Sequence, residues 1–155
     1  MAEKPAENLV YEFLFEQRDF FLADGEEYAD ADFEIHPSAY DKRNKNSGIE
    51  VGDADTSMLP NGNDDQMTEY DGLLTLEIYG RVTGQDKTNR IPARQKVFDI
   101  KLKLCQLFEQ FPTLDGRGCR VKVLRQVRFF DDTRADKYAI ERVPIVINPK
   151  DLKGE

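Results

Sequence analysis

The chain has few of the residues from which most enzyme and zinc sites are built. It contains one histidine, two cysteines and no tryptophan. A protein nucleophile needs a neighbouring base, and a structural zinc ion needs several Cys or His ligands. His36 stands before Pro37 with no cysteine or second histidine near it, so the sequence predicts a solvated or turn-capping side chain. We expect no enzyme, no cofactor and no metal site of the zinc type.

Long apolar runs are also absent. No stretch approaches the roughly 20 apolar residues that a membrane-spanning helix needs. Residues 1–8 are polar and lack the apolar segment of a signal peptide. The sequence allows a disulfide between Cys105 and Cys119, but two buried thiols fit a reducing compartment better. The sequence therefore predicts a protein made or assembled inside a cell, with no membrane partner.

Charge is plentiful and unevenly distributed. The net charge is −8, yet residues 24–71 hold fourteen acidic and three basic residues, whereas residues 72–155 hold eleven acidic and seventeen basic ones. The overall sign argues against a free-standing binder of duplex DNA, which needs a dominant basic surface. The division into an acidic and a basic part favours contacts between like subunits.

Apolar spacing divides the chain into elements. Residues 8–24 favour an amphipathic helix, although Leu9, Tyr11 and Phe13 also alternate as in a strand. Residues 25–71 form an acidic insertion with two short strand-like patches, and we expect deletion of part of residues 38–63 to spare the core. Residues 73–82 predict a strand, and residues 89–111 predict the longest helix, whose apolar stripe is Val97, Ile100, Leu104, Leu107, Phe108 and Phe111.

The last part of the chain predicts a hairpin. Residues 119–130 and 138–147 alternate as two strands, and residues 149–155 form a charged tail. The fold class is therefore α+β: one domain over residues 1–155, with a small, mainly antiparallel sheet packed against one long helix and an N-terminal helix. Its most regular part is a strand–helix–strand–strand unit from residue 70 to residue 148.

Two groups of charged residues are candidate binding residues. Arg120, Lys122 and Arg128 share one side of a predicted strand, which fits a solvated face, a nucleic-acid backbone or an acidic partner, including a neighbouring copy. The acidic candidates for a subunit or partner interface are Asp53, Asp55, Asp64 and Asp65.

Calcium is a further hypothesis for the acidic block. Asp53, Asp55 and Ser57 alternate, and Asp64 takes the twelfth place of that frame. An EF-hand loop has Gly at its sixth place and Glu at its twelfth, whereas Met58 stands sixth here. A solvated loop is the favoured interpretation, and a calcium-dependent binding or adaptor module is the alternative.

The order of elements resembles the tail terminator proteins of long-tailed bacteriophages. The resemblance rests on the helix that ends in Phe-Pro-Thr-Leu-Asp-Gly (residues 111–116), followed by a strand, the acidic pair Asp131 and Asp132, and a final strand. It covers residues 70–148, about half the chain, and in addition the first helix.

The resemblance implies a structural virion protein without catalytic residues or cofactor. Such a protein forms a hexameric ring in the tail–neck region, assembled in the host cytoplasm. The ring caps the tail-tube protein, docks to a head-connector or neck protein, and lets DNA pass through its lumen without specific binding. The block of residues 25–71 is longer than this family usually has, and we expect it to wrap a neighbouring subunit or contact the connector. Another neck or tail-tube protein is the alternative within the same class.

Overall fold

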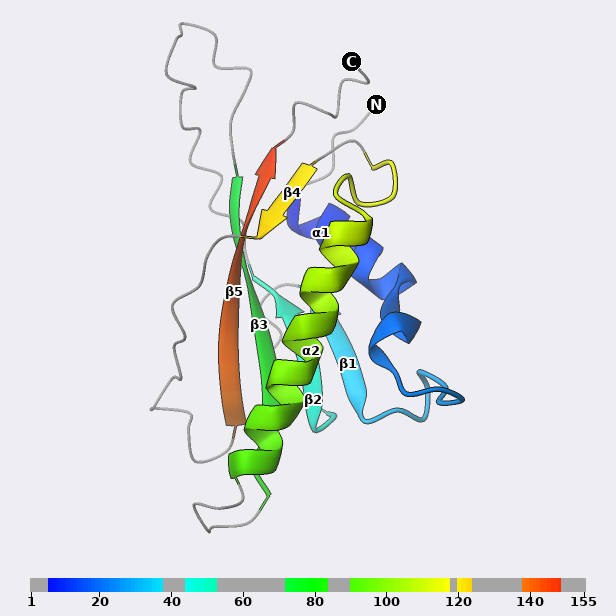
Figure 1. The fold of residues 1–155 in the computed structure, drawn as a ribbon, viewed down its shortest axis with the longest axis vertical. Coiled ribbons are helices and arrows are strands. Elements are labelled where there is room, and N and C mark those ends of the chain that lie inside the picture. The colour runs from blue at the N-terminus through cyan, green and yellow to red at the C-terminus, as the bar shows by residue number, and fades with distance from the viewer. Residues whose placement is uncertain are drawn as a thin grey trace, which may run out of the picture.

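The fold is a five-stranded sheet with its helices packed on one face (Figure 1). The computed structural model describes residues 6–37, 44–52, 72–83, 90–117, 120–123 and 138–148. The elements are α1 (Ala6–Glu16), η1 (Arg18–Phe21), β1 (Phe33–Pro37), β2 (Ser47–Val51), β3 (Gly72–Arg81), α2 (Arg90–Gln110), β4 (Arg120–Val123) and β5 (Tyr138–Asn148). The strand order is β1-β2-β3-β5-β4, and only the β1–β2 pairing is parallel. The predicted α+β class with a mainly antiparallel sheet is confirmed.

The first segment is a helix, as the spacing favoured, but a shorter one. Leu9, Val10, Phe13 and Leu14 are buried at the three- and four-residue spacing of one helical face. The α-helix ends at Glu16 and a 3₁₀ turn follows. The Arg18 guanidinium donates to the carbonyl oxygen of Phe15 at 2.8 Å, which satisfies one carbonyl of the last turn.

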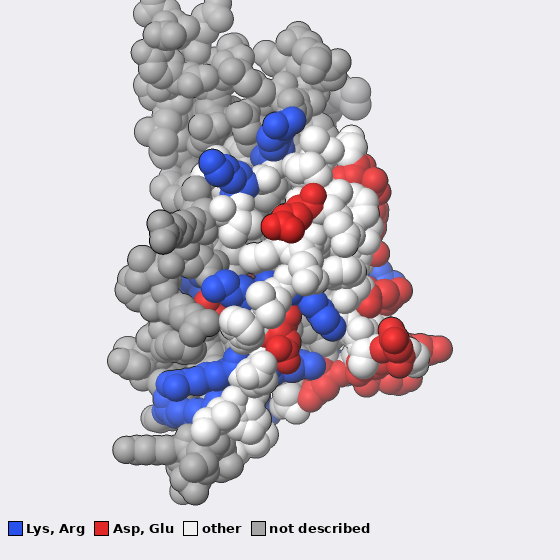
Figure 2. Space-filling view, viewed as in Figure 1, with Lys and Arg blue, Asp and Glu red and all other residues white. Residues whose placement is uncertain are grey.

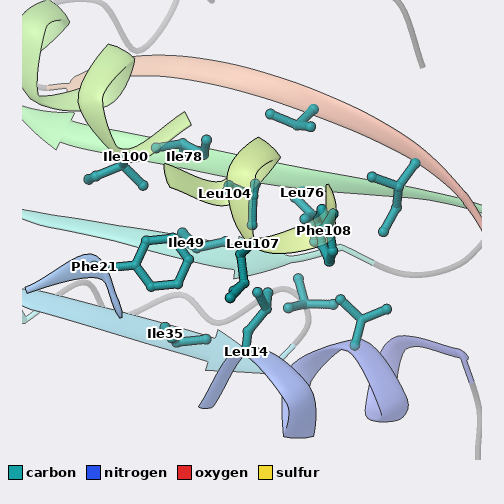
Figure 3. Packing of buried hydrophobic residues seen from close by; sticks show 14 of the residues in the cluster. Leu14, Phe21, Ile35, Ile49, Leu76, Ile78, Ile100, Leu104, Leu107 and Phe108 are labelled. Atoms are coloured by element: carbon teal, nitrogen blue, oxygen red, sulfur yellow. The ribbon is translucent and has the colours of Figure 1, made fainter. Parts of the chain in front are cut away.

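The long helix α2 supplies the centre of the core. Its predicted inward stripe is confirmed from Val97 to Phe108, while Phe111 is only half-buried. Leu104 and Leu107 lie over Ile49, Leu76 and Ile78 of the sheet (Figure 3). The inward apolar residues of β5 include Val143, Ile145 and Ile147.

A left-handed turn closes α2 and fixes the chain direction into β4. Leu114 and Asp115 have φ values of 52° and 57°, and Gly116 has a φ of 80°. Leu114 is fully buried, so the turn folds an apolar side chain back onto the core. Arg117 Nη1 donates to the Leu114 carbonyl oxygen at 3.0 Å, which holds the turn in place.

Two strands come from the block that the sequence assigned to an insertion. Both strand-like patches are confirmed as β1 and β2, and every residue of β2 is buried. Because β2 pairs with β3 from Ser47↔Gly80 to Val51↔Leu76, a deletion within residues 38–63 that includes β2 would remove a strand from inside the sheet. For any such deletion, the expectation that the core is spared is wrong.

The predicted C-terminal hairpin is confirmed where the structure describes it. β4 pairs with β5 in antiparallel register, with Val121 opposite Ile147. Val121 is buried, whereas its neighbours Arg120 and Lys122 are exposed, as the alternation predicted. Residues 124–137 and the tail 149–155 lie outside the described residues.

A candidate assembly surface and a buried polar cluster

The sheet face turned away from the helices carries a row of ionisable side chains. His36, Glu50, Glu77 and Arg142 stand opposite one another across β1, β2, β3 and β5. Side chains alternate along a strand, so these residues point away from the face that holds Ile35, Ile49 and Leu76. Arg142 Nε donates to Glu77 Oε1 at 3.0 Å. An opposite-charge pair directly across two strands contributes about 0.2–1 kcal/mol to the sheet.

On the same face, His36 also joins a compact hydrogen-bonded cluster with Glu34 and Tyr79 of the next row. Tyr79 Oη donates to Glu34 Oε1 at 2.7 Å. His36 Nε2 lies 2.8 Å from Tyr79 Oη and 2.9 Å from Glu34 Oε1. The backbone amides of Asn44 and Lys45 donate to the same Glu34 oxygen at 2.8 and 3.0 Å. One carboxylate oxygen therefore receives four polar contacts.

The contacts of the cluster assign its protons. Because the tyrosine hydroxyl donates its hydrogen to Glu34, its oxygen is left as an acceptor toward His36. The ionised carboxylate is an acceptor only. Nε2 of His36 must therefore carry a hydrogen, and this assignment follows from the hydrogen-bond pattern.

The carboxyl group of Glu34 is held in its charged form. Burial raises its pKa, but hydrogen bonds from Tyr79 and the Lys45 amide, together with the neighbouring His36, outweigh that effect and lower the pKa below 4.5. A carboxylate that accepts several hydrogen bonds is favoured over its neutral form.

Gly48 makes room for this cluster. A Cβ built at residue 48 would contact the carbonyl oxygen of Glu34 and the phenol group of Tyr79. Glycine is therefore required where β2 passes between β1 and the Tyr79 side chain, because any larger residue would displace the tyrosine hydroxyl.

The prediction of a solvated His36 is wrong, because its side chain is buried and hydrogen-bonded. The alternation of Phe33, Glu34, Ile35 and His36 showed that the glutamate and histidine share a face. Tyr79 lies 43 residues further along the chain, and no local pattern connects it to them.

Only two of the predicted interface residues lie in the described part of the chain. Arg120 and Lys122 are exposed on β4, on the same sheet face as Arg142. The other predicted residues lie outside the described residues: Arg128, Asp53, Asp55, Asp64 and Asp65.

The described surface nevertheless shows a strong separation of charge. Residues 6–37 contain ten acidic residues and one basic residue, whereas α2 contains five basic and two acidic residues. Figure 2 shows red side chains along the right and lower right, over the segment from α1 to β1, and blue ones toward the lower left, over the start of α2. The exposed acids of the segment between η1 and β1 are Asp24, Glu26, Glu27, Asp30 and Asp32.

In the described part of the chain, no group of three His, Cys, Asp or Glu side chains is arranged to hold a metal ion. None of the described helices combines the length and the apolar character needed to cross a bilayer. Cys105 is a half-buried free thiol, and burial raises its pKa.

No model of a protein family matches the chain, and no curated protein matches it.

Glu34→Gln should lower the free energy of unfolding at pH 7 and make that free energy depend less on pH in the acidic range. Hydrogen bonds to a charged group contribute about 1.5–3 kcal/mol, so a loss of about that size is expected at pH 7. Because the pKa of Glu34 is lowered in the folded state, its contribution is present above the ordinary pKa of 4.5 and is lost as pH falls through the folded value. Urea unfolding of the parent and the variant at several pH values between 3 and 7 measures both the loss of stability and its pH dependence.

Glu27→Gln is the matched control, since it removes an exposed carboxylate of the same type. We expect it to change the free energy of unfolding by less than about 0.5 kcal/mol. If both variants behave alike at pH 7, the Glu34 cluster does not contribute as described.

Proposed function

We propose that this chain is a ring-forming structural protein of the phage tail–neck region, like the tail terminators. It caps the tail-tube protein and docks to the head connector or neck. The order of helix, strand, long helix and hairpin, on which the resemblance rests, supports the proposal through α1, β3, α2, β4 and β5. The two additional strands, β1 and β2, extend the sheet on its other side.

The separation of charge on one subunit is the observation that carries the proposal. A closed ring requires heterologous contacts, in which one surface of a subunit meets a different surface of its neighbour. The acidic segment of residues 23–32 supplies one such surface, and the basic side chains of α2 and of β4, on opposite faces of the sheet, supply two candidates for the other. Since like copies would otherwise repel, oppositely charged surfaces also determine which face meets which.

The net charge of −8 supports the passage of DNA through a ring lumen. Sequence-independent binding of DNA comes from the neutralisation of its phosphates by Lys and Arg. A subunit with an excess of acidic residues neutralises few phosphates. DNA would therefore pass through the lumen without binding tightly to its wall.

Native mass spectrometry and electron microscopy of the purified chain test the proposal. We expect a closed ring, of six copies by the resemblance, that forms alone or on the ends of purified tail tubes. Monomers only, even with tail tubes present, would overturn the proposal. Open-ended growth of the chain into tubes would instead identify a tail-tube protein.

Charge reversal on β4 is a second test of the same proposal. Arg120→Glu with Lys122→Glu should leave the fold intact, because both side chains are exposed, and should weaken ring formation. The charge-conserving pair Arg120→Lys with Lys122→Arg is the control. Rings of unchanged stability in the reversed variant would exclude β4 as a contact surface.

A further inference from the structure

The outward side of α2 is apolar, although this side faces away from the sheet. Ile91 is 65% exposed and Leu102 is 46% exposed, and Phe98 lies half-buried between them. At about 100° per residue, these three positions fall within about 40° of one another, on the side of the helix opposite Leu104. Single exposed apolar residues are ordinary, but an aligned apolar stripe is typical of an interaction surface.

Cationic side chains border one edge of this stripe. Arg90 and Arg94 are one helical turn apart, and Arg94 is exposed. On the opposite edge, Gln95 donates to Asp99 at 2.9 Å, so that edge is polar but not cationic. The surface therefore combines an apolar centre with one basic edge, and its natural occupant is an acidic segment with small or apolar residues.

The chain itself contains such a segment between η1 and β1. Its acids are exposed, and Ala29 is exposed among them. The backbone is folded into turns, because Ala31 and Asp30 both donate to the Glu27 carbonyl oxygen, at 2.9 and 3.0 Å. Tyr28 anchors the turns through its ring contact with Phe15 and its hydroxyl contact with the Ile35 amide. The acidic segment is thus a preformed projection, which costs little ordering on binding.

Within one subunit, the acidic side chains over the segment from α1 to β1 lie at the right and lower right of Figure 2, whereas the basic side chains over the start of α2 lie at the lower left. A contact between them therefore joins two copies, and it joins unlike surfaces, as a ring requires. We propose that the outward stripe of α2, with Arg90 and Arg94 along its edge, binds the acidic segment of residues 23–32 of a second copy of this chain. The inference rests on the proposed function and names the surfaces that form its subunit contact.

A charge-swap experiment on the full chain tests the contact. Arg94→Glu and Glu27→Arg should each weaken self-association by at least about tenfold, because each places like charges opposite one another. The two substitutions in one chain should restore association to within about threefold of the parent, a difference below about 0.7 kcal/mol. Sedimentation velocity and native mass spectrometry measure association, and circular dichroism verifies the fold of each variant.

Two further variants separate this contact from a general effect of charge. Lys96→Glu makes the same charge change on an exposed position about 160° away from Arg94 around the helix, and it should leave association unchanged. Leu102→Asp should weaken association by placing a charge in the apolar stripe.

The outcomes distinguish this inference from the proposed function. If the parent forms rings while Arg94→Glu and Leu102→Asp form rings of equal stability, the contact is overturned and the ring remains. If the single swaps weaken association but the double swap does not restore it, the acidic segment is not the occupant. A parent that stays monomeric even with tail tubes overturns the proposed function itself.

Discussion

Leu104→Asp is expected to unfold the domain at room temperature. Leu104 is fully buried at the centre of the inward face of α2, between the helix and β3 (Figure 3). Truncation of a buried leucine alone costs about 2–5 kcal/mol. A buried, unpaired charge adds several kcal/mol to that loss. Because the free energy of unfolding of a domain is only about 5–15 kcal/mol, the sum removes most or all of it.

The same substitution at Leu102 is the control, since it lies on the outward side of the helix and half in solvent. At a protein concentration that keeps the chain monomeric, we expect Leu102→Asp to change the free energy of unfolding by less than about 1 kcal/mol. Far-ultraviolet circular dichroism and urea titration measure both variants. A Leu104→Asp chain that melts like the parent would show that the inward face of α2 is assigned wrongly.

The core was predictable from the sequence because its pattern is local. The spacing of Val97, Ile100, Leu104 and Phe108 identifies one face of a helix without knowledge of the rest of the fold. Leu74, Leu76 and Ile78 identify one face of a strand in the same way. These periodicities survive in the structure because the helix and sheet bury those faces against each other.

The sheet order and the buried polar cluster were not predictable in this way. The short strand β2 looks like a patch in a polar loop, and only its pairing with β3 makes it an interior strand. His36 likewise looks like a loop residue until Tyr79 and Glu34 surround it. Both features depend on contacts between distant parts of the chain, which composition and spacing do not encode.

The candidate contact surfaces were only partly predictable from the sequence. The acidic character of residues 24–71 was evident, and its most acidic described part is the turn segment at its beginning, while the aspartates around residue 60 lie outside the described residues. The sequence does not single out the outward stripe of α2, because the inward stripe alone accounts for the helical spacing of apolar residues. Ile91 and Leu102 differ from the core residues only in exposure, which a sequence does not give.

We expect the buried ion pair between α2 and β5 to contribute more to the free energy of unfolding than any other polar contact among the described residues. Lys101 Nζ donates to Glu141 Oε1 at 2.7 Å, and the two side chains are 18% and 4% exposed. Glu141 stands opposite Ile78 in register and so points into the layer between the sheet and the helix. Burial raises the pKa of the half-buried Cys105 thiol, which lies one turn along α2 from Lys101.

Lys101→Met should therefore cost about 3–5 kcal/mol, because it removes the Lys101 ammonium from a buried carboxylate. The double variant Lys101→Met with Glu141→Leu should recover most of that loss, since apolar residues of similar volume replace a buried pair with little change in stability. Urea unfolding of the four chains of this cycle gives the coupling free energy directly.

Lys96→Met, on an exposed position of the same helix, is the control and should stay within about 0.5 kcal/mol of the parent. If Lys101→Met is no more costly than Lys96→Met, the carboxylate of Glu141 finds enough water or other partners at this site, and the layer between α2 and β5 is less closed than its geometry indicates.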